Sequence, residues 1–150
     1  MNDSLPPLPL DAIEIGATVA DWRAAVNRAG DALVRSGAAK PGYAREMIRM
    51  IEEHGPYVVI APGLALAHAR PGPDVLADGL AIVTLATPVE FGHPHNDPVS
   101  VVLALAIATA DRHLAAVAGL ANVFNDSTAI ADIAAATTAQ EIITIMENES

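Results

Sequence analysis

The sequence predicts an α/β fold in which helices cover both faces of a central mixed β-sheet. Two segments, Leu80–Leu85 and Val99–Ile107, are continuous apolar runs of strand length, which is typical of strands buried on both faces. The chain is 52% hydrophobic but only 3% aromatic, so its core must consist mainly of Ala, Val, Ile and Leu, which suits helices packed on a sheet. Its 150 residues contain no internal repeat and no linker-like segment, so we expect a single domain over residues 1–150.

The first third of the chain combines extended and helical patterns. Its opening residues are rich in proline, which predicts an extended lead-in over residues 1–10. Apolar residues then recur at helical spacing, and the Ser36-Gly37 pair marks the end of that pattern. In order, we expect a short strand at Ile13 and Ile15, a helix over Asp21–Arg35 and a helix from Pro41 to Glu53.

The middle of the chain is typical of strands, and its end is typical of helices. The Pro62-Gly63 pair predicts a tight turn between two short strands, Tyr57–Ile60 and Leu64–Ala67. The two long apolar runs follow. Helical patterns then predict three helices, over His113–Val123, Ser127–Ala136 and Ala139–Met146.

Composition and charge exclude several classes of function. The chain has no cysteine, which excludes disulfides, thiolate metal ligands and a cysteine nucleophile. Its net charge is −10 with Lys40 as the only lysine, so we expect no nucleic-acid partner, because such binding needs clustered basic residues. The N-terminal residues do not resemble a secretory signal, and the longest apolar run is too short to span a bilayer. We therefore expect a cytoplasmic protein with no direct membrane insertion.

His68 is the strongest candidate for chemistry. It ends a short apolar strand, and its neighbours Ala67 and Ala69 are too small to shield its ring. Imidazole titrates near neutral pH and can act as a nucleophile without a second base. Arg70, two residues further on, is a fixed cation that can bind phosphate oxygens, and strand geometry places it on the same face.

Four other histidines are weaker candidates. His113 lies at the start of a predicted helix, where backbone N–H groups and the helix dipole favour an anion such as phosphate. His54 ends a predicted helix, where a histidine has a favourable interaction with the helix dipole. His93 and His95, followed by Asp97, resemble the first half of the zinc motif of metallo-hydrolases, although Pro98 stands where that motif continues with another histidine.

Three segments together resemble the EIIA components of the sugar phosphotransferase system. They are GPYVVIAPGLALAHARP (residues 55–71), GLAIVTLATPVEFGHPHNDPVSVVLALA (residues 79–106) and DRHLAAVAGLANVF (residues 111–124). Their order and spacing are similar to those of the mannitol/fructose class (type 2), and most closely to its ascorbate-type branch. The resemblance extends from about Asp11 to Met146.

The resemblance implies a phosphocarrier with the fold predicted above. His68 would accept a phosphoryl group from phospho-HPr and pass it to a cysteine of EIIB, which in turn serves the membrane component EIIC. His113 would support the phosphorylated ring, and Arg70 would contact the phosphate. Such a phosphotransferase relay requires no cofactor and no metal. Its transported substrate would be ascorbate or a related sugar or polyol.

The sequence departs from the family pattern at two positions. Ala67 stands where the family often has a proline before the active histidine. Mannitol-type members also carry an arginine in the preceding helix, and the aligned position here is Met50, with Arg49 adjacent. We therefore favour Arg70 over Arg49 as the cation near His68.

Two alternative functions remain open from the sequence. One is a regulatory EIIA-like phosphoprotein that signals to a partner without serving a transporter. The other is a metal-dependent hydrolase that uses His93, His95 and Asp97 as ligands, for which a catalytic zinc needs about three protein ligands.

Overall fold

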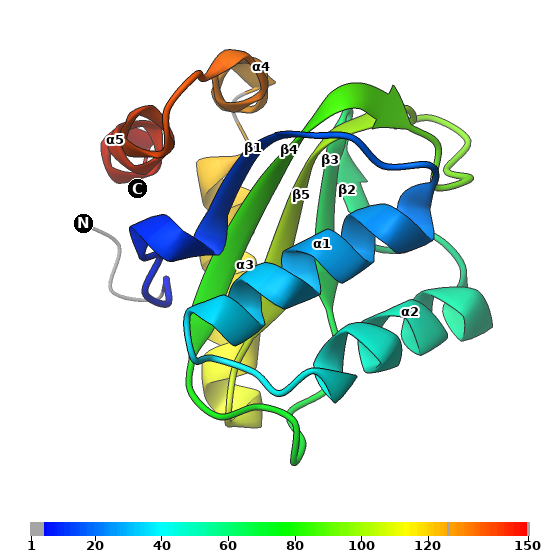
Figure 1. Cartoon of the computed structure of the whole chain (residues 1–150), viewed down its shortest axis with the longest axis vertical. Coiled ribbons are helices and arrows are strands. Elements are labelled where there is room, and N and C mark those ends of the chain that lie inside the picture. Colours follow the sequence, from blue (N-terminus) through cyan, green and yellow to red (C-terminus); the bar gives the residue numbers. More distant parts are fainter. Residues whose placement is uncertain (1–4, 126, 150) are drawn as a thin grey trace.

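The computed structural model describes residues 5–125 and 127–149 of the chain. Within these residues a five-stranded sheet has the order β1-β4-β5-β3-β2, and Figure 1 shows it lying behind the helices α1 and α2. Its strands are β1 (Ile13–Ala17), β2 (Val59–Ala61), β3 (Leu64–His68), β4 (Gly79–Val89) and β5 (Val99–Ala106).

The sheet is mixed, as the sequence predicted. Strand β1 is parallel to β4, and β3 is parallel to β5. Strand β4 is antiparallel to β5, and β2 is antiparallel to β3. Strand β3 therefore lies inside the sheet, and its last residue, His68, pairs in register with Leu105 of β5.

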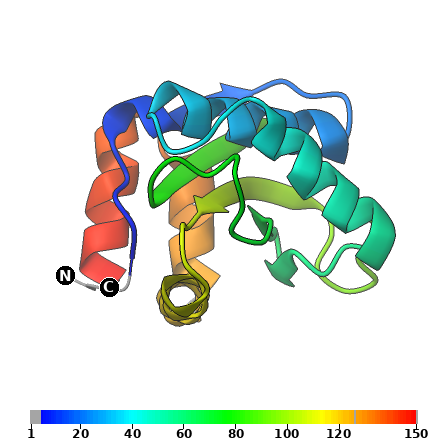
Figure 2. The same cartoon turned by 90° about the horizontal axis from the view of Figure 1, so that it is seen from below.

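Helices cover both faces of the sheet, which confirms the predicted fold class (Figure 2). Helices α1 (Trp22–Arg35) and α2 (Gly42–His54) pack on one face. The other face is covered by α3 (Ala110–Val123), α4 (Ser127–Ala135) and α5 (Ala139–Glu149). Apolar side chains fill both layers between helices and sheet, because the sheet is buried on its two faces.

Alternation along β3 assigns its side chains to the two layers. Leu64 and Leu66 belong to the layer under α3 and α4, whereas Ala65 and Ala67 belong to the layer under α1 and α2. Since side chains alternate along a strand, His68 falls on the same side as Leu66, toward α3.

Helices α1 and α2 approach each other closely because small residues line their contact. A Cβ atom added at Gly30 of α1 would lie 2.5 Å from the Cβ of Ala44 of α2, a distance that real side chains do not tolerate. The contact fixes the position of the first turn of α2. Tyr43 of that turn bonds to the backbone just after the end of β3.

The predicted element boundaries differ from the observed ones at several points. The predicted strand Tyr57–Ile60 is wrong at its start, because the N–H groups of Tyr57 and Val59 bond to Gly55 and Pro56 in a turn. Strand β4 extends well beyond the predicted Leu80–Leu85. The helix expected to begin at His113 begins at Ala110, with the side chain of Thr109 as its N-cap.

The expected extended lead-in over residues 1–10 falls partly outside the described residues. Residues 5–9 form no helix or strand, and a short 3-10 helix covers Leu10–Ala12. In the described residues no single helix is long and apolar enough to cross a bilayer, although α3 and the Thr128–Ala135 part of α4 meet that criterion together as a sharply bent pair.

Candidate active site

His68 is the last residue of β3, and one of its two ring nitrogens is hydrogen-bonded to the backbone. Its Nδ1 atom is 2.8 Å from the carbonyl oxygen of Leu66. A carbonyl oxygen can only accept a hydrogen bond, so Nδ1 carries the proton and Nε2 of the neutral ring keeps its lone pair. Burial of the ring lowers the pKa of His68, more than the bond to Leu66 raises it. The ring is therefore held neutral with Nε2 as its nucleophilic atom.

His113 lies against His68. The ring centroids are 5.3 Å apart with an angle of 52° between the ring planes. Helix α3 places His113 in its first turn, where the His113 N–H donates to the carbonyl of Thr109 at 3.0 Å. Burial, and to a smaller extent the neighbouring His68, lowers the pKa of His113. The sequence singled out both residues, and the structure brings them together.

The Nδ1 atom of His113 is buried and has no hydrogen-bond partner among the described residues. A buried polar atom without a partner is costly and is often found at functional sites. Of the two rings, His113 carries the unsatisfied buried nitrogen within the described residues, whereas Nδ1 of His68 is bonded.

Tyr57 is a site residue that the sequence analysis missed. Its ring meets the His68 ring edge to face, with centroids 5.5 Å apart and planes at 89°, and 40% of its surface is exposed. The prediction placed Tyr57 in a strand, which hid its position in the turn beside His68. The Gly55-Pro56 pair before it, a strong turn signal, could have revealed this.

Arg70 is exposed and lies beyond β3, which ends at His68, so the strand spacing that predicted it on the face of His68 does not apply. It lines a cavity with Tyr43 and Glu46 of α2. Burial raises the pKa of the Tyr57 phenol, and the positive charge of Arg70 offsets part of that rise. Arg70 therefore acts electrostatically on Tyr57, whose ring contacts His68.

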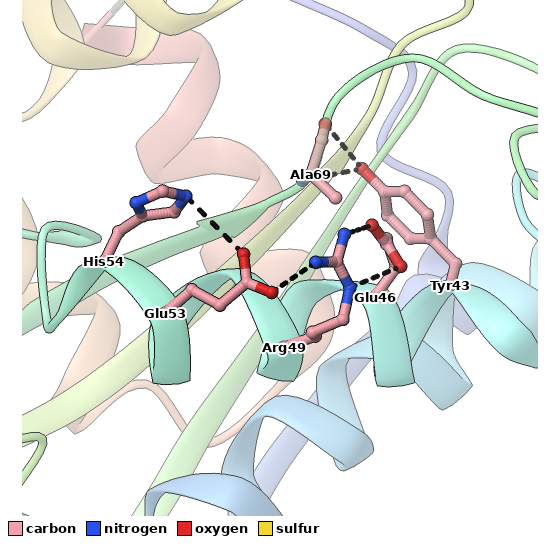
Figure 3. A network of polar contacts seen from close by, with 6 residues as sticks. All are labelled: Tyr43, Glu46, Arg49, Glu53, His54 and Ala69. Atoms are coloured by element: carbon pink, nitrogen blue, oxygen red, sulfur yellow. Dashed lines mark hydrogen bonds and ion pairs between the residues drawn. The ribbon is translucent and has the colours of Figure 1, made fainter.

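Arg49 is paired with two carboxylates of its own helix (Figure 3). Its guanidinium pairs with Glu46 and, at 2.6 Å, with Glu53. Both pairs are exposed and follow the helical spacing of three and four residues, which is a common surface arrangement. His54 continues the row, with Nε2 3.8 Å from the Glu53 carboxylate.

His93, His95 and Asp97 lie in a loop at the opposite end of β3. The Asp97 carboxylate accepts hydrogen bonds from the backbone N–H groups of residues 91, 92 and 93, at 2.7 to 3.1 Å. The Nδ1 atom of His93 accepts from the N–H groups of His95 and Asn96. These side chains organise the loop, and residues 5–125 and 127–149 contain no group of three side chains that could hold a metal ion.

The loop is tied to the turn that starts β3. The carbonyl of Asn96 accepts from the N–H of Gly63 at 3.0 Å. Gly63 adopts φ +80°, and a Cβ added there would meet Ser100 at 3.4 Å, so glycine suits this position. The loop therefore belongs to the far edge of the fold from His68.

Comparison with known proteins identifies the family. Residues 7–149 match the family described as phosphoenolpyruvate-dependent sugar phosphotransferase system, EIIA 2. The chain belongs to this family. The resemblance stated from the sequence is thus confirmed over nearly the whole chain.

Named relatives and solved structures agree with the EIIA assignment. The ascorbate-specific PTS system EIIA component of Shigella boydii serotype 4 (strain Sb227) is 35% identical over 137 residues, which are 91% of this chain and 89% of that protein. The crystal structure of a Streptococcus mutans protein described as PTS IIA (PtxA) has a TM-score of 0.83 and 34% identity, covering 91% of this chain and 87% of that one.

A more distant structure shares the fold. Enzyme IIAMTL in its complex with phosphorylated enzyme IIBMTL from Escherichia coli has a TM-score of 0.79 at 23% identity, and the match covers 95% of this chain and 99% of that one. At this identity the likeness concerns the arrangement of helices and strands alone.

Proposed function

We propose that this protein is a cytoplasmic EIIA phosphocarrier that accepts a phosphoryl group from phospho-HPr on His68 and passes it to a cysteine of EIIB. The observation that carries the proposal is the hydrogen bond between Nδ1 of His68 and the carbonyl of Leu66. It leaves Nε2 as the nucleophile in a ring whose pKa is lowered by burial, as phosphoryl transfer to imidazole requires.

The transfer exchanges one nitrogen–phosphorus bond for another. The lone pair of His68 Nε2 attacks the phosphorus of the donor, the bond to the donor imidazole breaks, and that imidazole leaves with the electron pair. The His68 ring becomes positively charged on attack, and the Leu66 carbonyl accepts from its Nδ1–H throughout. No metal and no nucleotide takes part in this step.

His113 and Arg70 supply the polar groups around the transferred phosphoryl group. His113 lies against the His68 ring and has a buried nitrogen without a partner. Arg70 adds a positive charge that acts on Tyr57. Charge that develops on the phosphoryl oxygens is stabilised by such preorganised groups.

The surface around His68 suits transient partners. Tyr57 is 40% exposed and Leu114, next to His113, is 72% exposed, so apolar side chains flank the two histidines. Exposed apolar groups beside a reactive residue are typical of docking surfaces. Enzyme IIAMTL, which shares this fold, is known in complex with phosphorylated IIBMTL, which supports EIIB as the acceptor and, through it, the membrane component EIIC.

Ascorbate is the transported substrate that the relatives favour. Several relatives that are 34–35% identical are named ascorbate-specific EIIA components. We therefore propose that the partner EIIB belongs to the ascorbate type. Transfer from the phosphorylated protein to an ascorbate-type EIIB, compared with a mannitol-type EIIB under equal conditions, tests this; faster transfer to the mannitol type would contradict it.

Intact-mass spectrometry tests the phosphocarrier role. The protein is incubated with phosphoenolpyruvate, Enzyme I and HPr and measured at mildly alkaline pH. We expect the wild-type protein to gain one acid-labile phosphoryl group and the His68→Ala variant to gain none. Circular dichroism shows whether the variant is folded. Equal labelling of a folded His68→Ala variant would refute the assignment.

A further inference from the structure

Tyr43 connects helix α2 to the end of the strand that carries His68. Its ring is 2% exposed. Its hydroxyl oxygen accepts from the N–H of Ala69 at 3.2 Å and donates to the carbonyl of Leu105 at 2.6 Å. Figure 3 shows the Tyr43 side chain pointing from α2 toward Ala69.

The two backbone groups that Tyr43 joins are immediate neighbours of His68. Ala69 follows His68 in the chain, and Leu105 is the residue that pairs with His68 in the parallel register of β3 and β5. The Tyr43 hydroxyl therefore bridges the two strands at the point where their ladder ends. Burial raises the pKa of Tyr43 to about 12, so the hydroxyl stays protonated and can donate.

We propose that Tyr43 is a positioning residue for phosphoryl transfer at His68. It acts through the peptide between His68 and Ala69 and does not touch the reacting atoms. This inference rests on the proposed role of His68 as the phosphoacceptor.

The Tyr43 hydroxyl affects the positions of two candidate site residues. Ala69 lies between His68, the proposed nucleophile, and Arg70, the proposed phosphate contact. A fixed Ala69 N–H holds the peptide plane that carries His68, and the chain continues directly from Ala69 to Arg70. A free Ala69 N–H would instead be a buried donor without a partner, and the strand end would shift to satisfy it. Small shifts of a reacting group cost much of its rate.

Helix α2 can act as the support because its own position is fixed. Its first turn packs against α1 through the close contact of Gly30 and Ala44, and Ala44 is the residue after Tyr43. The Tyr43 hydroxyl thus links the end of β3 to a rigid helix pair, which meets the need for support behind a reactive group.

The test compares Tyr43→Phe with a matched control, Thr84→Val. Tyr43→Phe removes only the hydroxyl. Thr84 is also buried, and its hydroxyl oxygen accepts from the N–H of Gly16 at 2.9 Å. Thr84→Val therefore removes a part-buried bond between a hydroxyl group and the backbone, in β4 and away from His68. Thermal unfolding of both variants measures the loss of stability that the two changes share.

Two readouts separate positioning from stability. The first is the rate of phosphorylation by phospho-HPr at a temperature where all proteins are folded. For Tyr43→Phe we expect kcat to fall about tenfold with KM nearly unchanged, and for Thr84→Val we expect wild-type kcat. The second is the ¹⁵N NMR signature of the His68 ring without phosphate, which should show one tautomer in the wild type and a mixture in Tyr43→Phe.

Each outcome decides the proposal. Wild-type kcat and a single His68 tautomer in Tyr43→Phe would overturn it, as would an equal loss of kcat in Thr84→Val. If the wild-type protein itself takes up no phosphoryl group, the proposed function fails, and the ring signature alone then decides: a mixture of tautomers confined to Tyr43→Phe supports positioning by Tyr43, and an unchanged signature overturns it.

Discussion

The two ends of β3 each hold a pair of histidines, and the pairs differ in what their nitrogens do. His68 and His113 have ring centroids 5.3 Å apart, and His93 and His95 have centroids 6.2 Å apart. In the second pair, Nδ1 of His93 accepts two backbone N–H groups within its own loop. In the first, Nδ1 of His113 is buried and has no partner in the described part of the chain, and Nδ1 of His68 donates to the strand carbonyl of Leu66.

The comparison shows that proximity of two histidines does not by itself indicate a reactive site. The His93 loop uses its polar side chains to satisfy backbone donors, because a loop has no ladder to do so. The His68 end has the ladder of β3 and β5 behind it, so Nδ1 of His68 donates to a strand carbonyl and Nε2 keeps its lone pair. The four predictions that follow test this difference, from the largest expected effect to the smallest.

Replacing His68 and replacing the His93–His95 pair should have opposite effects on phosphorylation. We expect the His93→Ala/His95→Ala double variant to accept one phosphoryl group per chain, as the wild type does, because neither ring contacts His68. We expect His68→Gln, which preserves polarity at the strand end, to accept none, since the amide has no nucleophilic nitrogen. Intact-mass measurement gives both stoichiometries. Loss of labelling in a folded His93→Ala/His95→Ala variant would contradict this prediction.

Replacement within the reactive pair should slow transfer without preventing it. For His113→Ala we expect the rate of phosphorylation of His68 to fall about 10- to 100-fold, because a preorganised polar group beside the phosphoryl group is lost. The measurement is single-turnover transfer from phospho-HPr. His95→Ala is the matched control, since His95 is exposed and lies in the loop at the opposite end of β3. An unchanged rate in His113→Ala would remove this residue from the site.

Loss of Asp97 should affect stability and leave transfer unchanged. Asp97→Ala deprives three backbone N–H groups of a charged acceptor, so we expect a loss of about 2 kcal/mol in the free energy of unfolding. Urea unfolding measures it, with the exposed Asp31→Ala as control. The rate of phosphorylation per folded molecule should stay at the wild-type value; a tenfold slower rate would link the loop to the reactive site.

The lowered pKa values of His68 and His113 should make stability depend on pH. Burial holds both below the ordinary value of about 6.5, so just below that pH the unfolded chain binds more protons than the folded protein. Stability is therefore lost as pH falls from about 7 through the lowered pKa values. Urea unfolding at pH 7.5 and 5.0 should show this loss, and the His68→Gln/His113→Gln variant should show a smaller one. An equal loss in that variant would assign the effect to other groups.

Much of the fold was predictable because its signals are local. The apolar runs of β4 and β5 indicated buried strands, and the helical spacing of Asp21–Arg35 matched α1 to within one residue. The limits of β4 were less predictable, since its far end passes through Ala86, Thr87 and Pro88, which carry no strand pattern. Pairing with β5 extends the strand there, and pairing is not visible in one segment alone.

The site was predictable in part. His68 was a candidate because it ends an apolar strand between small residues, and His113 became one through the resemblance of its helix to the EIIA family, since a helix start alone did not distinguish it. Tyr57 and Tyr43 were not: the first lies in a turn that resembled a strand, and the second matched the buried face of a helix, where an aromatic residue is expected in the core. The hydroxyl of Tyr43 gains its role only from the meeting of α2 with the ends of β3 and β5.

The partner of His68 Nδ1 also has a consequence for how this protein can vary. The partner is a main-chain oxygen two residues earlier in the same strand, so no substitution at another position can delete it. A substitution can therefore change the tautomer only by moving the end of the strand, as we expect for Tyr43→Phe. The tautomer of His68 is thus a property of the backbone position more than of any one neighbouring side chain.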